Sequence, residues 1–432
     1  MNRFLKTLAG ITALSLTACL GETVDYTGPE ICPGFPDVPV FYPPEMASAP
    51  LSTITQESVE NSNEFALKFY LANSKECRGN VCVSPFSVGS VLAMIANGGT
   101  GTGRDEILSL LGFEESESGL NALNTHYQTL LSNLPNIEED ISCKFTNSLW
   151  CDPTLHPINE SFMQTISGHY YAGKVDFAPG GESGKAAINE FVSKNTNGLI
   201  REFLSSPLDI DLAFLNTSYF KAGWTYPFFK DKTSKEDFHD IDYKKQKTDF
   251  MVNRAILEYA QTEDGTEAVR LNYGNKRQFS MTLILPTTLI NHVALDEVLT
   301  TENVRQINSN FKHMDMKVKL PKFDVGLNNP NTIDILREMG LEQVCTGKAF
   351  FSMISENKPF FLKCFVHAAK LKVDEEGTEG AAASLGGMDY ASPGDEIPQK
   401  PLEIVFNRPF IFYIQENTTG SILFIGSVKT FS

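Results

Sequence analysis

The sequence predicts one large α+β domain, and three observations support this prediction. Apolar residues recur at helical spacing in the first half of the chain, whereas alternating or continuous apolar runs typical of strands dominate the second half. No linker-like composition recurs between residue 56 and Ser432. The length of 432 residues would also suit two or three domains of about 150 residues each, but single domains of about 250 residues or more exist.

The first 18 residues are typical of an export signal. Two basic residues precede a largely apolar stretch at 7–18, which would span only about 18 Å as a helix and is too short for a bilayer core of about 30 Å. A short buried helix is the alternative. The end of the stretch, Leu16-Thr17-Ala18-Cys19, resembles the bacterial lipobox, which implies a lipoprotein anchored to the membrane only through a lipid on Cys19. Because Leu20 replaces the aspartate that retains some lipoproteins in the inner membrane, we expect the outer membrane, on its periplasmic or its cell-surface face.

A proline-rich segment follows and predicts a tether over residues 19–55. Seven of the 22 prolines lie between Pro29 and Pro50, without a helical or alternating apolar pattern. Such a sequence favours extended polyproline II structure at about 3.1 Å per residue, so it could hold the domain away from a membrane. A loop packed on the domain is the alternative.

Helical signals open the domain. Apolar residues at helical spacing predict a helix over 57–72. The same spacing predicts a second helix over 87–97, which follows Pro85 and ends at Gly98. Helices therefore dominate the first half of the domain.

Strand signals follow later in the chain. Alternation predicts strands over 279–285 and 316–320, each with one buried face. Near the C-terminus, apolar runs at 404–413 and 421–428 are separated by Asn417-Thr418-Thr419-Gly420, which predicts a hairpin at the end of the chain.

Cysteine usage leaves the disulfide pairing open. Seven cysteines remain once Cys19 is set aside, so at least one thiol stays unpaired within the chain. Cys77 and Cys82 flank a short turn that a disulfide could close in an oxidising compartment. Cys143 and Cys151 would lie roughly 26 Å apart on one extended strand and could not bridge each other without a bend. Metal-ligand spacing is absent from the cysteines and the seven histidines, so we expect no metal site.

Composition excludes several classes of function. Lys plus Arg number 36 against 53 Asp plus Glu, and the resulting net charge of −17 disfavours binding to nucleic acid or to anionic lipid. The content of 42% hydrophobic and 11% aromatic residues excludes intrinsic disorder of the whole chain.

The sequence also lacks a catalytic constellation. Neither the Gly-x-Ser-x-Gly nor the His-Glu-x-x-His motif is present. The glycine-rich stretch at 97–105 has Arg104 and Asp105 where a phosphate-binding loop needs Lys and Ser or Thr, and it follows a predicted helix instead of a strand. We therefore expect a protein that is not an enzyme and that uses no cofactor.

The segment Val366–Ser384 closely resembles the hinge of the serpins, the serine protease inhibitor family. Further motifs of this family stand in the family order: Ser84-Pro85-Phe86-Ser87, Asn216–Trp224, Leu320–Phe323, Met339–Leu341 and Phe406–Phe410. The resemblance covers residues 56–432. It implies the serpin fold, with three β-sheets, about nine helices and an exposed reactive-centre loop, in a protein that acts as a monomer. It also implies that Asn407, Arg408, Pro409 and Phe410 belong to a core strand.

The resemblance implies a hinge that can enter a sheet as a strand. Its residues are Glu375, Glu376, Gly377, Thr378, Glu379, Gly380, Ala381, Ala382, Ala383 and Ser384. Along a strand, Thr378, Gly380, Ala382 and Ser384 share one uncharged face that can be buried. A flexible surface loop rich in Ala and Gly is the alternative that this segment alone would leave open.

The mechanism that the resemblance implies is a suicide trap. A serine protease, or a cysteine protease, attacks the loop and forms an acyl-enzyme, and insertion of the cleaved loop then distorts the protease. Serpin reactive bonds usually lie at the seventeenth residue counted from the hinge glutamate, so Glu375 as the first predicts the bond Ala391–Ser392. Ala391 favours elastase-like proteases, whereas cleavage after Tyr390 would suit a chymotrypsin-like one. The rival function is a non-inhibitory serpin, a binding or carrier protein whose loop is only a substrate.

Other residues of this sequence match two further functional regions of the serpins, the shutter and the breach. Ser84, Ser87, Asn216 and His367 match the shutter, the polar cluster beneath the sheet, so His367 is expected to be structural. The breach, where insertion begins, is matched by Trp224, Lys322 and Glu375. An ion pair between Lys322 and Glu375 would favour the uninserted state only modestly if it is exposed. The stretch 104–139 has no basic cluster, so an activating polyanion is not indicated.

Three departures from the family pattern bear on this function. Gly380 stands where the family usually has alanine, which lowers β propensity and would slow insertion. The segment 392–403 is long and contains three prolines, so the cleaved bond could be displaced. Cys345 stands where the family usually has a buried phenylalanine, and nothing in the sequence explains it.

Overall fold

The computed structural model describes residues 50–75, 77–287, 295, 298–355, 360–378 and 400–431. Within this part of the chain there are nine α-helices: α1 (Gln56–Lys75), α2 (Pro85–Ala96), α3 (Thr102–Leu110), α4 (Glu117–Asn133), α5 (Glu160–Tyr170), α6 (Gly181–Asn195), α8 (Thr301–Asn310), α9 (Thr332–Glu338) and α10 (Glu342–Cys345). Short 3-10 helices cover Leu51–Thr53, Leu134–Asn136 and Lys230–Lys232. None of the described helices has the length and apolar character needed to cross a membrane.

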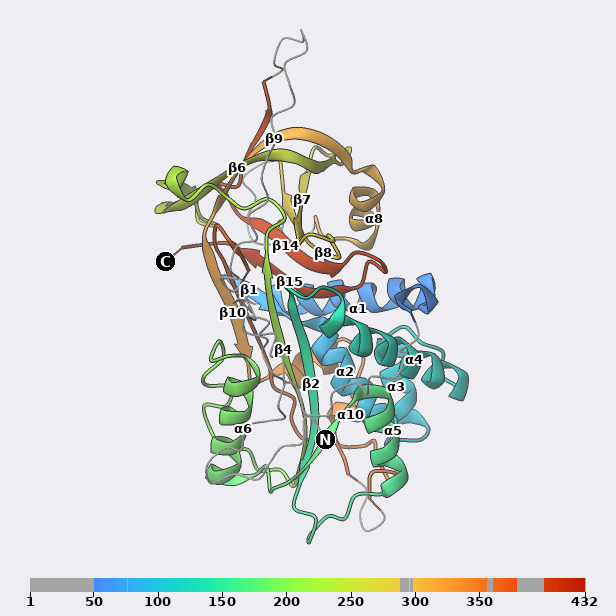
Figure 1. The fold of residues 1–432 in the computed structure, drawn as a ribbon. Helices are drawn as coiled ribbons and strands as arrows, with labels where there is room; N and C mark the ends of the chain where they lie inside the picture. The colour runs from blue at the N-terminus through green and yellow to red at the C-terminus, as the bar shows by residue number, and fades with distance from the viewer. Residues whose placement is uncertain are drawn as a thin grey trace, which may run out of the picture.

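Six strands form a long sheet that runs down the molecule (Figure 1). In spatial order they are β10 (Phe323–Asn329), β11 (His367–Val373), β12 (Gly377–Thr378), β4 (Leu212–Gly223), β2 (Ser142–Cys151) and β3 (Gly173–Asp176). All neighbouring pairs are antiparallel except β2 and β3. The very short β12 thus lies between two much longer strands.

The remaining strands form a nine-stranded sheet with two arms joined at β6. One arm has the order β1 (Val81–Val83), β15 (Ile422–Val428), β14 (Phe410–Glu416), β8 (Phe279–Leu285) and β7 (Glu267–Tyr273). The other has β5 (Ser234–His239), β9 (Lys312–Pro321) and β13 (Leu402–Val405). The 17-residue β6 (Lys245–Gln261) pairs with β5, β9 and β7 along its length. Counting the two arms separately gives the expected three sheets, and the α+β prediction is confirmed.

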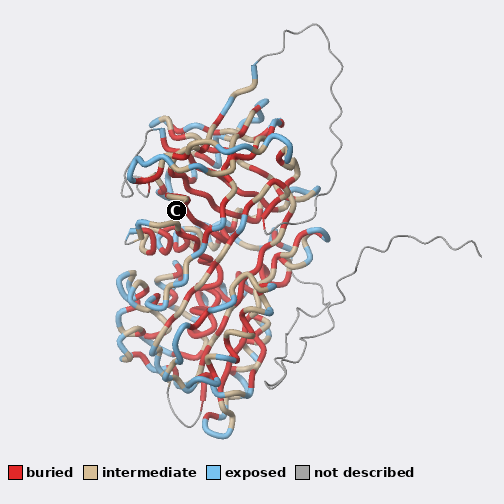
Figure 2. Tube along the Cα trace, turned by 90° about the vertical axis from the view of Figure 1, so that its left-hand side faces the viewer, coloured by how far each residue is buried: buried red, intermediate tan, exposed pale blue. Residues whose placement is uncertain are grey.

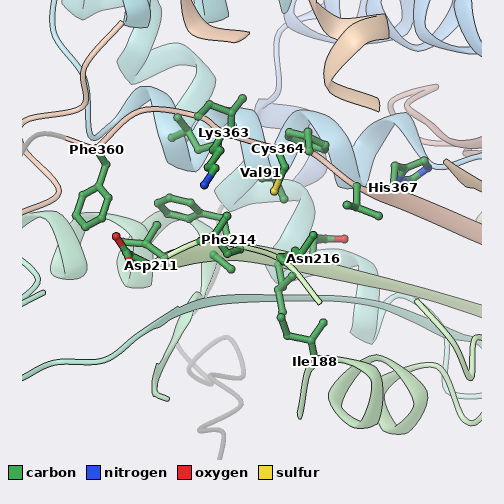
Figure 3. A pocket seen from close by; sticks show the side chains of 18 of the residues that line it. Val91, Ile188, Asp211, Phe214, Asn216, Phe360, Lys363, Cys364 and His367 are labelled. Atoms are coloured by element: carbon green, nitrogen blue, oxygen red, sulfur yellow. The ribbon is translucent and has the colours of Figure 1, made fainter. Parts of the chain in front are cut away.

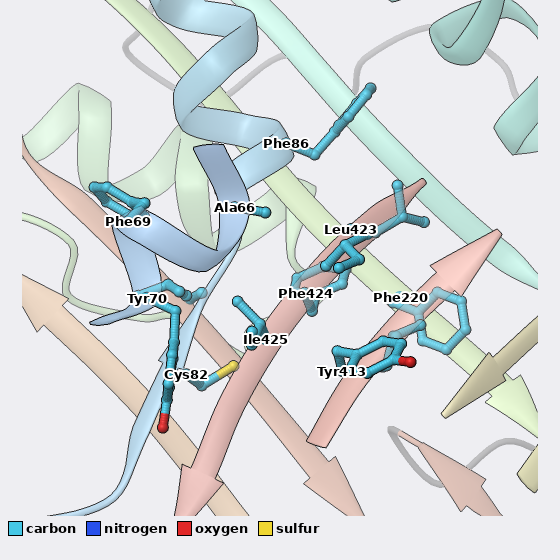
Figure 4. Packing of buried hydrophobic residues seen from close by; sticks show 14 of the residues in the cluster. Ala66, Phe69, Tyr70, Cys82, Phe86, Phe220, Tyr413, Leu423, Phe424 and Ile425 are labelled. Atoms are coloured by element: carbon cyan, nitrogen blue, oxygen red, sulfur yellow. The ribbon is translucent and has the colours of Figure 1, made fainter. Parts of the chain in front are cut away.

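The six-stranded sheet is covered by helices on both faces. Figure 1 shows α6 and α2 on opposite sides of the β2 and β4 pair. On the α6 side, Trp150 packs against Phe191 with ring centroids 5.5 Å apart. On the other side, Phe69 of α1, Phe86 of α2 and Phe424 of β15 all belong to the main core (Figure 4). Figure 2 shows buried residues along the interior and exposed residues at the periphery.

The two predicted helices are confirmed, with small differences at their ends: the first extends beyond its predicted range at both ends, whereas the second begins two residues earlier and ends one residue earlier than predicted. The helix expected at 57–72 is α1, and the one expected at 87–97 is α2. Helix α2 begins at Pro85, whose missing N–H costs nothing in the first turn, and Ser84 caps it by accepting a hydrogen bond from the Ser87 amide. The helix ends before Asn97 and Gly98.

The strands expected at 279–285 and 316–320 are confirmed, but the apolar run at 404–413 is not one strand. It divides into β13, which is parallel to β9, and β14, which forms the terminal hairpin with β15. Residues 407–409 form a bend between them, so the prediction of a core strand at Asn407, Arg408 and Pro409 is wrong, and only Phe410 is in a strand. Arg408 instead donates hydrogen bonds of 3.0 and 2.6 Å to the Pro286 carbonyl.

The structure corrects the idea of a disulfide between Cys77 and Cys82. Both are free thiols: Cys82 is a residue of β1 with its side chain buried in the core (Figure 4), while Cys77 is half-buried after the end of α1. Burial raises the pKa of the Cys82 thiol. Further free thiols in the described residues are Cys143, Cys151, Cys345 and Cys364.

The predicted signal and most of the predicted tether lie outside the described residues, and so does Cys19. The last part of the predicted tether, residues 50–55, is described. There Leu51 is buried in a 3-10 helix and packs against the main core.

Candidate functional site

Two residues of the predicted hinge, Gly377 and Thr378, already form a strand within the long sheet. The chain leaves β11, turns at residues 374–376 and returns as β12. Thr378 pairs with Val373 on one side and with Ala222 on the other, and β12 is antiparallel to both neighbours. The Asp374 carboxylate fixes the turn by accepting hydrogen bonds from the amides of Glu376 (2.9 Å) and Gly377 (3.3 Å).

Both residues of β12 are fitted to this position. A Cβ atom at Gly377 would lie 2.0 Å from the backbone oxygen of Ala222, so only glycine allows this close approach of the two strands. Thr378 is fully buried, and its hydroxyl lies 2.5 Å from the hydroxyl of Tyr273. Burial raises the pKa of Tyr273, so its hydroxyl is neutral and can donate.

The rest of the predicted hinge, from Glu379 to Ser384, lies outside the described residues. The predicted reactive bond Ala391–Ser392 lies outside them as well. The geometry of the site therefore comes from the ends of the surrounding strands and from residues 374–378.

The structure brings together the three predicted breach residues. The Lys322 ammonium lies 2.7 Å from the Glu375 carboxylate, and Trp224 donates from its indole nitrogen to the Asp374 carbonyl at 3.0 Å. The Trp224 amide also donates to the Glu376 carbonyl at 2.8 Å. Trp224 therefore holds the turn that precedes β12.

Glu375 is held as an anion although it is almost buried. Burial acts to raise the pKa of Glu375, but hydrogen bonds from Lys322 and from Thr233, the latter at 2.6 Å, outweigh this effect and lower the pKa below its ordinary value. A second lysine, Lys230, pairs with the neighbouring Glu376. Both glutamates of the turn thus have cationic partners.

Three of the four predicted shutter residues are hydrogen bonded to one another. The Ser84 and Ser87 hydroxyls are 3.0 Å apart, and the Ser84 amide donates to Nε2 of His367 at 3.0 Å. Asn216 is not bonded to them; it donates to the Asn147 side chain at 2.8 Å. Burial lowers the pKa of His367 to about 3, so the ring is neutral and accepts at Nε2, as a structural histidine does.

A cavity of about 330 Å³ lies between β4 and the segment leading into β11. Figure 3 shows Phe214 and Asn216 from β4 on one side of it, with Cys364 and His367 on the other. Ile188 of α6 also borders it. The cavity lies at the end of β4 and β11 that is far from β12. Asn216 and His367 therefore face the same space even though no hydrogen bond joins them.

No cluster of three or more His, Cys, Asp or Glu side chains suited to a metal ion occurs within the described ranges. Ser84, Ser87 and His367 are hydrogen bonded to one another, as in a structural network. The buried Oδ1 of Asn216 and the buried hydroxyl of Thr217 have no hydrogen-bond partner among the described residues. The pairing of β12 with both neighbours shows that this part of the sheet holds a short strand between β4 and β11.

Sequence reasoning missed three residues that complete the site. Tyr273 and Thr233 bond the hinge directly, and Asn147 bonds Asn216. A buried tyrosine at the end of a strand gives no signal of its own, because a tyrosine ring at that position is equally typical of the core. Of the three, only Asn147 could have been noticed in the sequence, because it is a polar residue in the middle of a strand whose C-terminal end is apolar.

Comparisons with known proteins support the same family as the motifs. The model of the family Serpin, serine protease inhibitor, matches residues 60–430. A serine protease inhibitor of Cyanea capillata is 31% identical over 361 residues, which cover 81% of this chain and 92% of that protein. The leukocyte elastase inhibitor of Sus scrofa is 28% identical over 388 residues, with 85% and 98% covered.

Solved structures show the same fold. The thermophilic serpin tengpin in its native state is 26% identical, with a TM-score of 0.76 over 89% of this chain and 98% of that one. Thyroxine-binding globulin in complex with thyroxine is 20% identical, with a TM-score of 0.76 over 87% of this chain and 99% of that one.

Proposed function

Because the chain belongs to the serpin family, we propose that it inhibits serine proteases by inserting its cleaved loop between β4 and β11. The observation that carries the proposal is β12. Two residues of the hinge are already paired with β4 and β11, so a strand has begun at the place where insertion would proceed.

Extending β12 in its observed register gives a specific expectation for the rest of the hinge. Thr378 lies opposite Ala222 and Val373, so a regular strand would place Ser384 opposite Asn216 of β4 and His367 of β11. Gly380, Ala382 and Ser384 would share the buried face with Thr378. The hinge would thus reach the predicted shutter after six further residues.

The reaction that drives this insertion belongs to the protease. Its nucleophile attacks the Ala391 carbonyl carbon, an ester or thioester bond forms, and the peptide bond to Ser392 breaks, with the nucleophile's proton passing to the leaving amine. Cleavage frees the chain between Thr378 and Ala391 to extend β12. We propose that the contacts of Trp224 and of Lys322 with the turn hold the start of the strand while it grows.

We propose an elastase-like protease as the target, because Ala391 is small, and a chymotrypsin-like protease if the cut falls after Tyr390. The test is incubation of the protein with an elastase-like protease, followed by a denaturing gel and mass spectrometry of the released peptide. A covalent complex and a peptide that begins at Ser392 are expected. Complete cleavage without complex, and without a rise in the melting temperature of the cut protein, would contradict the trap.

The rival proposal is a binding or carrier serpin whose loop is merely cut. The sequence observation that favours it is Gly380, which lowers the tendency of the hinge to extend as a strand. The same incubation distinguishes the two functions, because only an inhibitor retains the protease covalently.

We also propose that the chain is exported and anchored to the bacterial outer membrane through Cys19. The support is the Leu16–Cys19 sequence after an apolar stretch. Incorporation of labelled palmitate by cells that express the full chain, and its loss in Cys19→Ala, would test the anchor. Accessibility of the domain to added protease in intact cells would separate the cell surface from the periplasm.

A further inference from the structure

Glu138 is a buried carboxylate whose partners lie in a distant segment of the chain. It follows the 3-10 helix at 134–136, between α4 and β2, and is 5% exposed. One of its oxygens accepts hydrogen bonds from the amides of Asn275 (2.5 Å) and Lys276 (2.9 Å). The other oxygen is buried and has no hydrogen-bond partner among the described residues. The carboxylate therefore acts as a local anchor for the turn after β7.

Gly274 makes this contact possible. Its φ is +64°, and a Cβ atom there would lie 2.5 Å from the Glu138 carboxyl group. A side chain at this position would be strained and would also displace the carboxylate. The turn at 274–276 and Glu138 are thus fitted to each other.

The same turn is bonded to the end of β4. The Gly274 amide donates to the Gly223 carbonyl at 2.8 Å, and the Thr225 hydroxyl donates to the Gly274 carbonyl at 2.5 Å. Trp224, which lies between those two residues, stacks on Tyr273 with ring centroids 4.4 Å apart. Movement of the turn would therefore displace both aromatic side chains.

Both aromatic residues contact the hinge or the turn before it. Tyr273 directly precedes Gly274 and contacts the Thr378 hydroxyl, while Trp224 bonds the backbone at Asp374 and Glu376. Two bonded routes thus lead from Glu138 to β12, one through Tyr273 and one through Trp224.

We propose that Glu138 is a positioning residue for loop insertion. It fixes the turn at 274–276, and through Tyr273 and Trp224 it keeps β12 seated between β4 and β11. The inference rests on the proposed inhibitory function for its biological meaning. Loss of Glu138 would unseat the start of the strand, delay insertion relative to hydrolysis of the acyl-enzyme, and turn more of the inhibitor into substrate.

Hydrogen exchange of the full chain without protease tests the structural link. Glu138→Ala is expected to speed exchange in peptides covering 272–277 and 376–378 by about tenfold, as loss of about 1.4 kcal/mol of local stability would do. Glu138→Gln, which retains an acceptor for both amides, should have a smaller effect. The matched control is Glu139→Ala, because Glu139 is exposed on the same segment, and it should leave both peptides unchanged.

Two results would overturn the inference. One is faster exchange at 272–277 in Glu138→Ala with no change at 376–378, and the other is an equal effect of Glu139→Ala. If Glu138→Ala does not fold, Glu138→Gln combined with Tyr273→Phe replaces it, and strictly additive effects on exchange at 376–378 would contradict the link.

Titration against an elastase-like protease then separates this inference from the proposed function. If the unmodified chain forms a covalent complex, Glu138→Ala should need more inhibitor per protease than Glu139→Ala does, and equal requirements would refute the positioning role. If the unmodified chain forms no complex, the inhibitory function fails, while the exchange experiment still decides whether Glu138 controls β12.

Discussion

The hydroxyl groups of Tyr273 and Thr378 lie 2.5 Å apart in the core, where they join β7 to the two-residue strand β12. Thr378 is the last described residue before the rest of the loop. This contact is one of several that hold the hinge within the sheet, and the loss of a single hydroxyl group should weaken it.

Replacing Tyr273 with phenylalanine removes one hydroxyl and leaves the ring stack on Trp224 in place. The Thr378 hydroxyl would then be buried without its partner, which costs about 1–3 kcal/mol. We expect β12 to leave the sheet more often, which is measured as faster hydrogen exchange at 376–378. Unchanged exchange there would show that the hydroxyl pair does not hold the hinge. Tyr243→Phe is the control, because Tyr243 is exposed.

A charged side chain at Thr378 should convert the inhibitor into a substrate. Thr378→Arg would force a guanidinium into a fully buried position, and an unpaired buried charge is costly. We expect the protease to cut the loop normally while the amount of covalent complex falls by about tenfold. This corresponds to a change of about 1.4 kcal/mol in the barrier to insertion relative to the barrier to hydrolysis of the acyl-enzyme. Thr125→Arg on the exposed face of α4 should retain full complex formation. Normal complex formation by Thr378→Arg would argue against insertion at β12.

Removing Lys322 should destabilise the protein more at neutral than at acidic pH. The lowered pKa of Glu375 contributes stability that is present above the ordinary carboxyl pKa and is lost as the pH falls through the lowered value. Lys322→Met should cost about 1–2 kcal/mol at pH 7, because a charged hydrogen bond is lost at a nearly buried carboxylate, and less at pH 3. Thermal unfolding across this range measures the difference.

The control for that variant is Lys317→Met, which breaks the more exposed pair with Glu403 at 3.0 Å. Exposed pairs contribute about 0–1 kcal/mol, so its effect at pH 7 should be smaller. If the two variants lose the same stability at every pH, the Lys322 and Glu375 pair has no special role at the hinge.

His126 should limit stability in acid. It is buried against Phe113 and Tyr127, both ring nitrogens lack hydrogen-bond partners among the described residues, and burial lowers its pKa to about 4. The unfolded chain binds the proton more readily, so stability should fall as the pH drops from about 6.5 toward 4. His126→Phe should remove about 3 kcal/mol of this loss, whereas exposed His313→Gln should not. Parallel pH profiles for the unmodified chain and His126→Phe would contradict this assignment.

Gly380→Ala should make the protein a more efficient inhibitor. Alanine restricts the backbone more than glycine and suits an extended strand better, so insertion should compete better with hydrolysis of the acyl-enzyme. Titration of a fixed amount of protease measures the inhibitor required. A requirement that does not fall would remove Gly380 as a reason for slow insertion.

Local patterns explain which elements could be predicted from the sequence. Helix α2 was predictable because Pro85, the apolar spacing after it and Gly98 all act within one segment. The apolar run at 404–413 misled the prediction because apolar residues continue from β13 into β14. Only the partner strands β9 and β8, which are distant in sequence, show that β13 and β14 are separate strands in different arms of the sheet.

The site residues that could be predicted from the sequence are those that match the family motifs. Lys322 and Glu375 match those motifs, and the structure places them in contact. Tyr273 and Glu138 lie in ordinary-looking segments and act through contacts with residues more than 100 positions away along the chain. No periodicity or composition encodes such pairings, because they depend on how the two sheets pack.

A structure of the protein after cleavage of its loop tests the central claim most directly. The account predicts that β12 continues in its present register, with Ser384 between Asn216 and His367, so that it pairs with β4 and β11 along the length of these two strands. A cleaved protein in which β12 still ends at Thr378, with the cut loop outside the sheet, would contradict insertion between β4 and β11.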